Sequence, residues 1–193
     1  MSILQILKYP NPNLRQQAKT VKKFDQNLKL TIDDMLETMK DAKGIGLAAT
    51  QVDIHSRIIV IDLSEDYSDP QIFINPEMSI VDETLSAYTE GCLSIPGVQE
   101  NIERPSVVII TASDANGDIF KAEYTGLMAS CIQHEIDHLN GKLFVDYLSP
   151  LKRQLIRKKM KKPILDFMMP NSKFEIEIKV LGCEVLILDE AVS

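Results

Sequence analysis

Residues 133–138 read QHEIDH, and this stretch decides how the rest of the 193-residue chain is interpreted. His134 and His138 are four residues apart, so on a helix both imidazoles lie on one face, one turn apart. Two such imidazoles can bind one divalent metal ion, and Glu135 can act on a water bound to that metal. The chain has only three histidines, which argues against a chance pairing. The stretch therefore predicts a helix that carries the metal site of a hydrolase.

The segments around this helix predict an α+β fold. Apolar spacing and a leading proline predict further helices on either side of it, at 25–42 and 150–161. Short runs rich in β-branched residues predict strands at 57–63, 71–78, 105–114 and 118–124, and Asn116-Gly117 is a hairpin signal between the last two. Strands and helices do not alternate regularly. This favours antiparallel β-sheets packed around the central HExxH helix at 126–140, with a C-terminal helix and a strand-like tail.

The length suggests one domain followed by a tail. We expect a catalytic domain over residues 1–162, which includes the C-terminal helix, and a separate tail over 163–193. The tail contains FEIEIKV at 174–180 and CEVLILD at 183–189, which are both strand-like. An exposed apolar strand face is an aggregation hazard, so we expect the tail to pack on the domain or on a second subunit.

Composition indicates an ordinary globular protein, with 45% hydrophobic and 25% charged residues. Three cysteines at irregular spacing do not suggest a secreted disulfide scaffold. The N-terminal residues lack the features of a signal peptide, and no run approaches the roughly 18 apolar residues that span a membrane. We therefore expect a cytoplasmic protein without a membrane partner, and the oligomeric state is left open.

The charge is unevenly distributed. The net charge is −7, yet residues 152–162 hold seven of the 21 basic residues and no acidic one. The basic helix at 150–162 has two equally weighted interpretations, a solvated surface or a contact with ribosomal RNA phosphates.

A catalytic metal site commonly has three protein ligands, so a third is needed. Cys92, in TEGCLSIPG, is the favoured candidate because a thiolate binds borderline metals strongly. Cys131 lies one helical turn before His134 and is equally consistent with a small core residue. His55 is better interpreted as a surface or structural histidine, and Cys183 as a core-facing residue of the tail.

A third motif, GIGLAATQ at 44–51, combines two glycines with an amide. The glycines permit close approach of a ligand, and Gln51 can donate a hydrogen bond. Taken alone, the motif is better explained as a tight connection from a helix to a strand.

Together, GIGLAATQ at 44–51, EGCLS at 90–94 and QHEIDH at 133–138 resemble the three signature motifs of peptide deformylases, in the same order. The resemblance runs from the N-terminus to about residue 160 and includes DYLSPLKR at 146–153. It is greatest to the bacterial type 1 enzymes. Three motifs in order leave little room for coincidence.

The resemblance implies a metallohydrolase that removes the N-formyl group from the formylmethionine of nascent polypeptides and releases formate. Metal-bound water would be the nucleophile, and Glu135 the general base and acid. The metal would be Fe2+, with Zn2+, Ni2+ or Co2+ as alternatives, held by Cys92, His134 and His138. Gln51 and the backbone N–H of Leu93 would stabilise the oxyanion.

The resemblance also implies how the substrate binds. The methionine side chain would lie in an apolar slot formed by Ile45, Leu127 and Cys131. Backbone groups of Ile45, Gly46 and Gly91 would pair with an extended peptide. Two residues near this slot stand out in the sequence: Ser130 replaces an apolar residue common in the family, and Glu90 can form an ion pair with Arg104 that braces the Cys92 loop.

Two alternatives remain at the level of sequence. An HExxH endopeptidase would cleave internal peptide bonds, although a thiolate ligand and the 44–51 loop argue against it. A structural metal site without turnover would have no use for Glu135.

Overall fold

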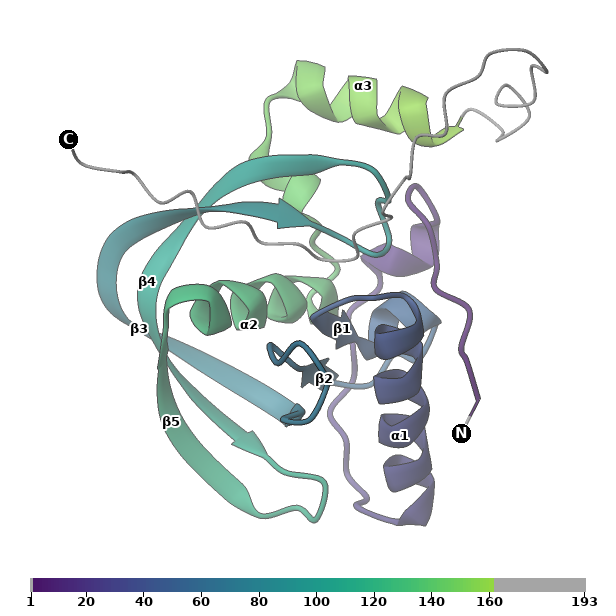
Figure 1. The fold of residues 1–193 in the computed structure, drawn as a ribbon, viewed down its shortest axis with the longest axis vertical. Helices are drawn as coiled ribbons and strands as arrows, with labels where there is room; N and C mark the ends of the chain where they lie inside the picture. Colours follow the sequence, from purple (N-terminus) through teal and green to yellow (C-terminus); the bar gives the residue numbers. More distant parts are fainter. Residues whose placement is uncertain (1, 162–193) are drawn as a thin grey trace.

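The computed structural model describes residues 2–161, so the predicted tail at 163–193 lies outside the described residues. The chain forms helices, strands and short 3-10 turns in this order (Figure 1): η1 Pro12–Arg15, α1 Gln26–Asp41, β1 Gly46–Ala48, η2 Ala49–Val52, β2 Ile58–Ile61, β3 Gln71–Gly91, β4 Gln99–Ser113, β5 Ile119–Thr125, α2 Gly126–Leu139, η3 Phe144–Tyr147 and α3 Pro150–Lys161. All three predicted helices are present, and so are the four strands predicted between residues 57 and 124.

The strands form one sheet in the order β1-β2-β3-β4-β5, and every neighbouring pair is antiparallel. This confirms the α+β prediction with antiparallel pairing. The sheet curves strongly, and α2 lies inside the curve, flanked by β3, β4 and β5 (Figure 1). Residue Gly117 turns the β4–β5 hairpin with φ +94°, a conformation that favours glycine, as the Asn-Gly signal predicted.

The two helices α1 and α2 share the apolar residues of β2. Ile59 and Ile61 are fully buried in the cluster that includes α2, whereas Ile58 and Val60 are buried in the cluster that includes α1. Successive side chains of a strand point to opposite faces, so the run IIVI fills both clusters. The burial of β2 on both faces fixes the β1–β2 edge of the sheet, which leads into the loop that carries Gln51.

Strands β3 and β4 are longer than the sequence indicated. β3 continues to Gly91 and β4 begins at Gln99, and the two pair along this whole extension with register shifts between Ile74 and Leu85. Nearly all residues from 77 to 87 are exposed, so no apolar alternation marks this part of the strand. The extension matters for the site because β3 ends at Gly91, directly before Cys92.

Among the described residues, no helix has the length and apolar character needed to cross a membrane.

Candidate metal centre

Three of the predicted ligands meet inside the curve of the sheet. Cys92 follows the end of β3, and α2 presents His134 and His138 from one face. Their ligand atoms all lie within 4.8 Å of one another, with Cys92 Sγ 3.2 Å from His138 Nε2. Cys131, the other cysteine considered, lies instead in the apolar cluster between α2 and the sheet.

This group of atoms fits one divalent metal ion. Nε2 of His134 is buried and has no hydrogen-bond partner among the described residues, although a buried ring nitrogen normally has one. One thiolate and two imidazoles form a donor set that suits zinc, iron, nickel or cobalt, and three protein ligands leave a position open. The coordination of a metal would satisfy the orphaned nitrogen.

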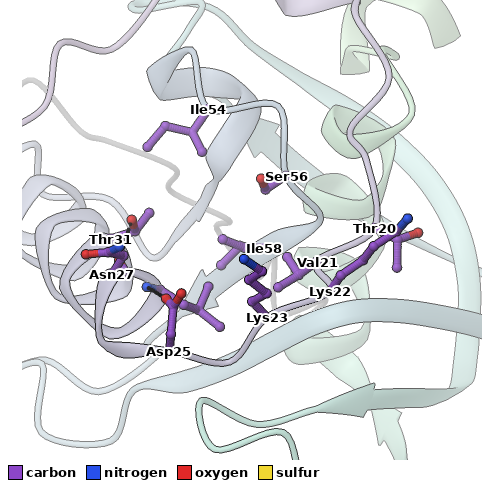
Figure 2. A pocket seen from close by; sticks show the side chains of 11 residues that line it. Thr20, Val21, Lys22, Lys23, Asp25, Asn27, Thr31, Ile54, Ser56 and Ile58 are labelled. Carbon is purple, nitrogen blue, oxygen red and sulfur yellow. Dashed lines mark hydrogen bonds between the residues drawn. The ribbon is translucent and has the colours of Figure 1, made fainter.

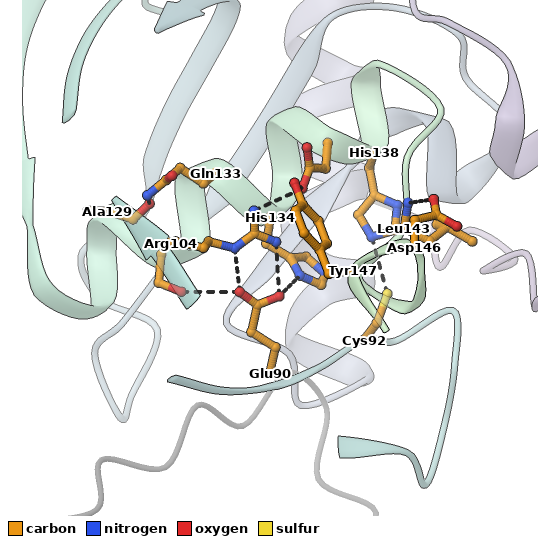
Figure 3. Close-up of polar contacts among 12 residues, drawn as sticks. Glu90, Cys92, Arg104, Ala129, Gln133, His134, His138, Leu143, Asp146 and Tyr147 are labelled. Atoms are coloured by element: carbon orange, nitrogen blue, oxygen red, sulfur yellow. Dashed lines mark hydrogen bonds and ion pairs between the residues drawn. The ribbon is translucent and has the colours of Figure 1, made fainter. Parts of the chain in front are cut away.

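Glu90 orients His134 by contacting the Nδ1 side of its ring (Figure 3). Its Oε2 lies 2.8 Å from Nδ1 of His134, and its other oxygen accepts a hydrogen bond from Nε of Arg104. Burial alone would raise the pKa of Glu90, but the hydrogen bonds from His134 and Arg104 outweigh it and lower the pKa to about 2. A carboxylate in this position fixes the ring so that Nε2 faces the metal position.

The predicted Glu90–Arg104 ion pair is therefore present, but it belongs to a larger network. Arg104 also bonds to Asp137 at 2.9 Å, and the hydroxyl of Tyr147 donates to the same carboxylate at 2.8 Å. The Tyr147 ring lies 5.1 Å from the Arg104 guanidinium carbon, a cation–π contact. Asp137 and Tyr147 did not stand out in the sequence, since neither belongs to a spacing that predicts a network.

Glu135 lies beside the ligands with its carboxylate in a closed environment. The residue is 1% exposed, and Oε2 has no hydrogen-bond partner among the described residues. Burial raises the pKa of Glu135 to about 7, against the opposing effect of His134. A Cβ on Gly46 would lie 2.6 Å from Oε1 of Glu135, so a side chain there would displace the carboxylate. The carboxyl group can thus both accept and donate a proton near neutral pH.

Gln51 and Leu93 lie on the two loops that meet beside Cys92. The amide nitrogen of Gln51 lies 3.5 Å from Cys92 Sγ and 3.2 Å from Ser94 Oγ, while its oxygen accepts from the Ala48 N–H at 2.8 Å. These contacts fix the amide so that its N–H groups face the thiolate. The Leu93 side chain packs against Gly44, where a Cβ would lie 2.7 Å from Leu93 Cδ1. The glycines of the 44–51 loop therefore permit close packing on both sides of the site.

Of the three predicted slot residues, Leu127 and Cys131 lie on α2, whereas Ile45 precedes β1. Ile45 and Leu127 are partly buried against the apolar cluster that contains Cys131. Burial raises the pKa of the Cys131 thiol well above its usual value, which makes it an inert neutral group. Ser130 is 2% exposed, and its hydroxyl lies 3.4 Å from Glu90 Oε1, so it faces the carboxylate.

Two features lie apart from this centre. His55 has its Nε2 3.3 Å from Asp53 and is not among the grouped ligands, consistent with the structural interpretation. A hollow of about 430 Å³ opens beside the start of α1 (Figure 2). It is lined by the residues Thr20, Val21, Lys22, Lys23, Asp25, Asn27, Leu28, Thr31, Ile54, Ser56 and Ile58, which include no histidine or cysteine.

Comparison with known proteins matches this chain to one family. A family model described as polypeptide deformylase matches residues 3–154. The peptide deformylase of Pseudomonas aeruginosa is 58% identical over 162 residues, which cover 84% of this chain and 96% of that protein. The peptide deformylase of Cellvibrio japonicus is 56% identical over the same share of each chain.

Solved structures agree with the fold. A peptide deformylase crystal structure from Legionella pneumophila is 43% identical with a TM-score of 0.79, covering 84% of this chain and 100% of the other. The peptide deformylase of Ehrlichia chaffeensis, solved in complex with actinonin, is 39% identical with a TM-score of 0.80 and covers 83% and 97%.

Proposed function

The chain belongs to the polypeptide deformylase family, and we propose how its own residues remove the formyl group from an N-terminal methionine. The chain is a hydrolase of that family. The observation that carries the mechanism is the buried Glu135 carboxylate beside Cys92, His134 and His138, with one oxygen that no described residue engages.

We assign Cys92, His134 and His138 as the ligands of one divalent metal, with Fe2+ expected. When bound, the metal would supply Lewis acidity, which lowers the pKa of water so that it can lose a proton and act as a nucleophile near neutral pH. The fit of the donor set and the orphaned Nε2 of His134 support this assignment. The negative charge of the Cys92 thiolate softens that Lewis acidity, and a ferrous site with a thiolate is expected to be sensitive to oxygen.

Glu135 is the group that moves the proton. Its buried carboxylate lies beside the three ligands and has an oxygen that no described residue engages, so it can accept a proton from the attacking water and later donate it to the leaving nitrogen. The C–N bond of the formamide breaks, and formate and a free α-amine are the products. The Gln51 amide and the Leu93 N–H are assigned as donors to the oxyanion, since both lie on the loops that meet at Cys92.

The substrate assignment extends the same geometry. We propose that Ile45, Leu127 and Cys131 line the slot for the methionine side chain, and that backbone groups at Gly46 and Gly91 align the peptide. A site that recognises one side chain and otherwise only backbone groups would accept many nascent chains. The catalytic unit proposed for this activity is residues 1–162.

The decisive experiment measures formate release from formyl-Met-Ala-Ser by protein loaded with Fe2+ without oxygen. We expect turnover of this peptide and none of the N-acetylated peptide or of an internal peptide bond. Glu135→Gln should retain the metal and lose at least about 100-fold in rate, as for the loss of a general acid–base group. Glu103→Gln changes an exposed glutamate on β4 and is the matched control. Equal rates for the two variants would refute the role of Glu135.

Ribosome contact through α3 is a separate proposal. The helix carries clustered basic residues, and two of them make contacts within the domain. Lys152 bonds to Glu100 at 2.6 Å, and Lys159 donates to the Gly97 carbonyl at 2.6 Å. We therefore propose that Arg157, Lys158 and Lys161 contact RNA phosphates. Replacing these three with glutamine should reduce ribosome co-sedimentation at moderate salt, whereas the same change at Lys22, Lys23 and Lys121 should not. Equal pelleting would exclude the proposal.

A further inference from the structure

Three consecutive residues near the N-terminus, Leu7 to Tyr9, bind both loops that carry the assigned oxyanion donors. The N–H of Leu7 donates to the carbonyl of Gln51 at 2.7 Å, and the N–H of Tyr9 donates to the carbonyl of Ser94 at 2.8 Å. Between them, the ammonium of Lys8 donates to the carbonyl of Leu93 at 2.6 Å. We call residues 7–9 the N-terminal strap, because it ties the two loops together.

The Lys8 contact differs from the two backbone contacts because it brings a charge. A hydrogen bond from an ammonium group is about twice as strong as a neutral one, and it restricts the direction of the peptide that accepts it. Desolvation lowers the pKa of Lys8, and the negative charge of Cys92 opposes this effect. The bond joins the ammonium group to the residue directly after Cys92.

We propose that Lys8 is a positioning residue for the reaction, whose ammonium group holds the carbonyl of the Leu93–Ser94 peptide. The bond restrains the backbone angles of Leu93, so that the N–H of the preceding Cys92–Leu93 peptide points at the developing oxyanion. This inference rests on the proposed function. Oxyanion donors act only when they are aligned before the reaction, and a small misplacement far from the chemistry can cost up to about 100-fold in rate. Lys8 touches no substrate atom in this proposal and acts through Leu93.

The chain offers a matched control on the same loop. Lys159 donates to the carbonyl of Gly97 at 2.6 Å, four residues after Leu93, with the same donor group and the same kind of acceptor. Lys159→Met therefore removes an equivalent bond from the loop without changing the Leu93 peptide.

The first measurement compares kcat and KM for formyl-Met-Ala-Ser at equal metal content. Lys8→Met should lower kcat about tenfold with KM changed less than about twofold, because alignment in the transition state is lost while ground-state binding remains. Lys8→Arg, which can still donate to the carbonyl, should restore most of the rate. A kcat for Lys8→Met equal to that of Lys159→Met, or no rescue by Lys8→Arg, would overturn the proposal.

The second measurement needs no activity. In metal-free protein, Lys8→Met should shift the NMR signal of the Leu93 amide and speed its hydrogen exchange, whereas Lys159→Met should leave both unchanged. An unchanged Leu93 amide in Lys8→Met would overturn the inference, whatever the activity of the variant. If instead the wild-type protein released no formate, the proposed function would fail, and the amide measurement would still test the Lys8–Leu93 link.

Discussion

Oε2 of Glu90 lies 2.8 Å from Nδ1 of His134, on the side of the ring opposite to the metal position. Arg104 also holds this carboxylate, so the orientation of a proposed metal ligand depends on two residues outside the proposed ligand set. Partners of this kind decide the tautomer and the direction of a ligating histidine. We therefore expect the affinity of the proposed centre for a metal to depend in part on these residues of β3 and β4.

Replacing Glu90 should weaken metal binding without removing a ligand. We expect Glu90→Gln to lower the affinity by about 10- to 100-fold, the usual loss when the partner of a ligating histidine is changed. Competition with a chelator measures the affinity, and Glu103→Gln on the same sheet is the control. An affinity equal to wild type would show that His134 needs no carboxylate partner.

Glu90 should also make the metal-free fold sensitive to acid. Its pKa is lowered to about 2 in the folded chain, below the value near 4.5 of an unfolded chain. A lowered pKa gives stability that is present above about pH 4.5 and is lost as the pH falls toward 2. Urea unfolding at several pH values should show this loss in wild type and a smaller one in Glu90→Gln. Parallel curves for the two proteins would contradict the expectation.

Glu135 should have the opposite effect on the metal-free protein. Its pKa is raised to about 7, so the folded chain holds a proton that the unfolded chain releases above about pH 4.5. Stability therefore falls as the pH rises from about 4.5 to 7. Glu135→Gln avoids this loss and should be more stable than wild type at pH 8, by at most on the order of 3 kcal/mol. The difference should vanish near pH 4, and a variant less stable than wild type at pH 8 would refute the reasoning.

A side chain at Gly46 should displace the Glu135 carboxylate. A Cβ there would meet Glu135 Oε1 at 2.6 Å, which is closer than any real contact of this kind. We expect Gly46→Ala to lower the rate of deformylation at least tenfold by displacing the carboxylate, since catalytic groups must be held within a fraction of an ångström. Metal content and thermal unfolding should change little. A fully active Gly46→Ala would mean that Glu135 can move without loss.

The local features of the site could be predicted because they have short-range signals. His134 and His138 share a helix face by their spacing, and Asn116-Gly117 signals a hairpin by its backbone preference. The placement of Cys92 beside His138 has no such signal, because it depends on how β3 and α2 pack. Thiolate chemistry made Cys92 the favoured third ligand, and the resemblance of three motifs to one family supported that choice.

Other features escaped prediction for physical reasons. The outer part of β3 is exposed on both faces, so it has no alternation of apolar and polar residues to reveal a strand. The contacts of Lys8 with Leu93 and of Tyr147 with Asp137 are made by residues whose types are ordinary at a protein surface. Such contacts are fixed by tertiary structure and leave no pattern in the sequence.

Cys92 and His138 are separated by 46 positions, and β4, β5 and most of α2 lie between them. The proposed third ligand therefore reaches the two histidines only when the sheet has closed around α2, and two histidines on an isolated helix would bind a metal weakly. Tight metal uptake should then report on the completion of folding. A partly synthesised or misfolded chain would then remain without metal and inactive, so that only correctly folded molecules become active.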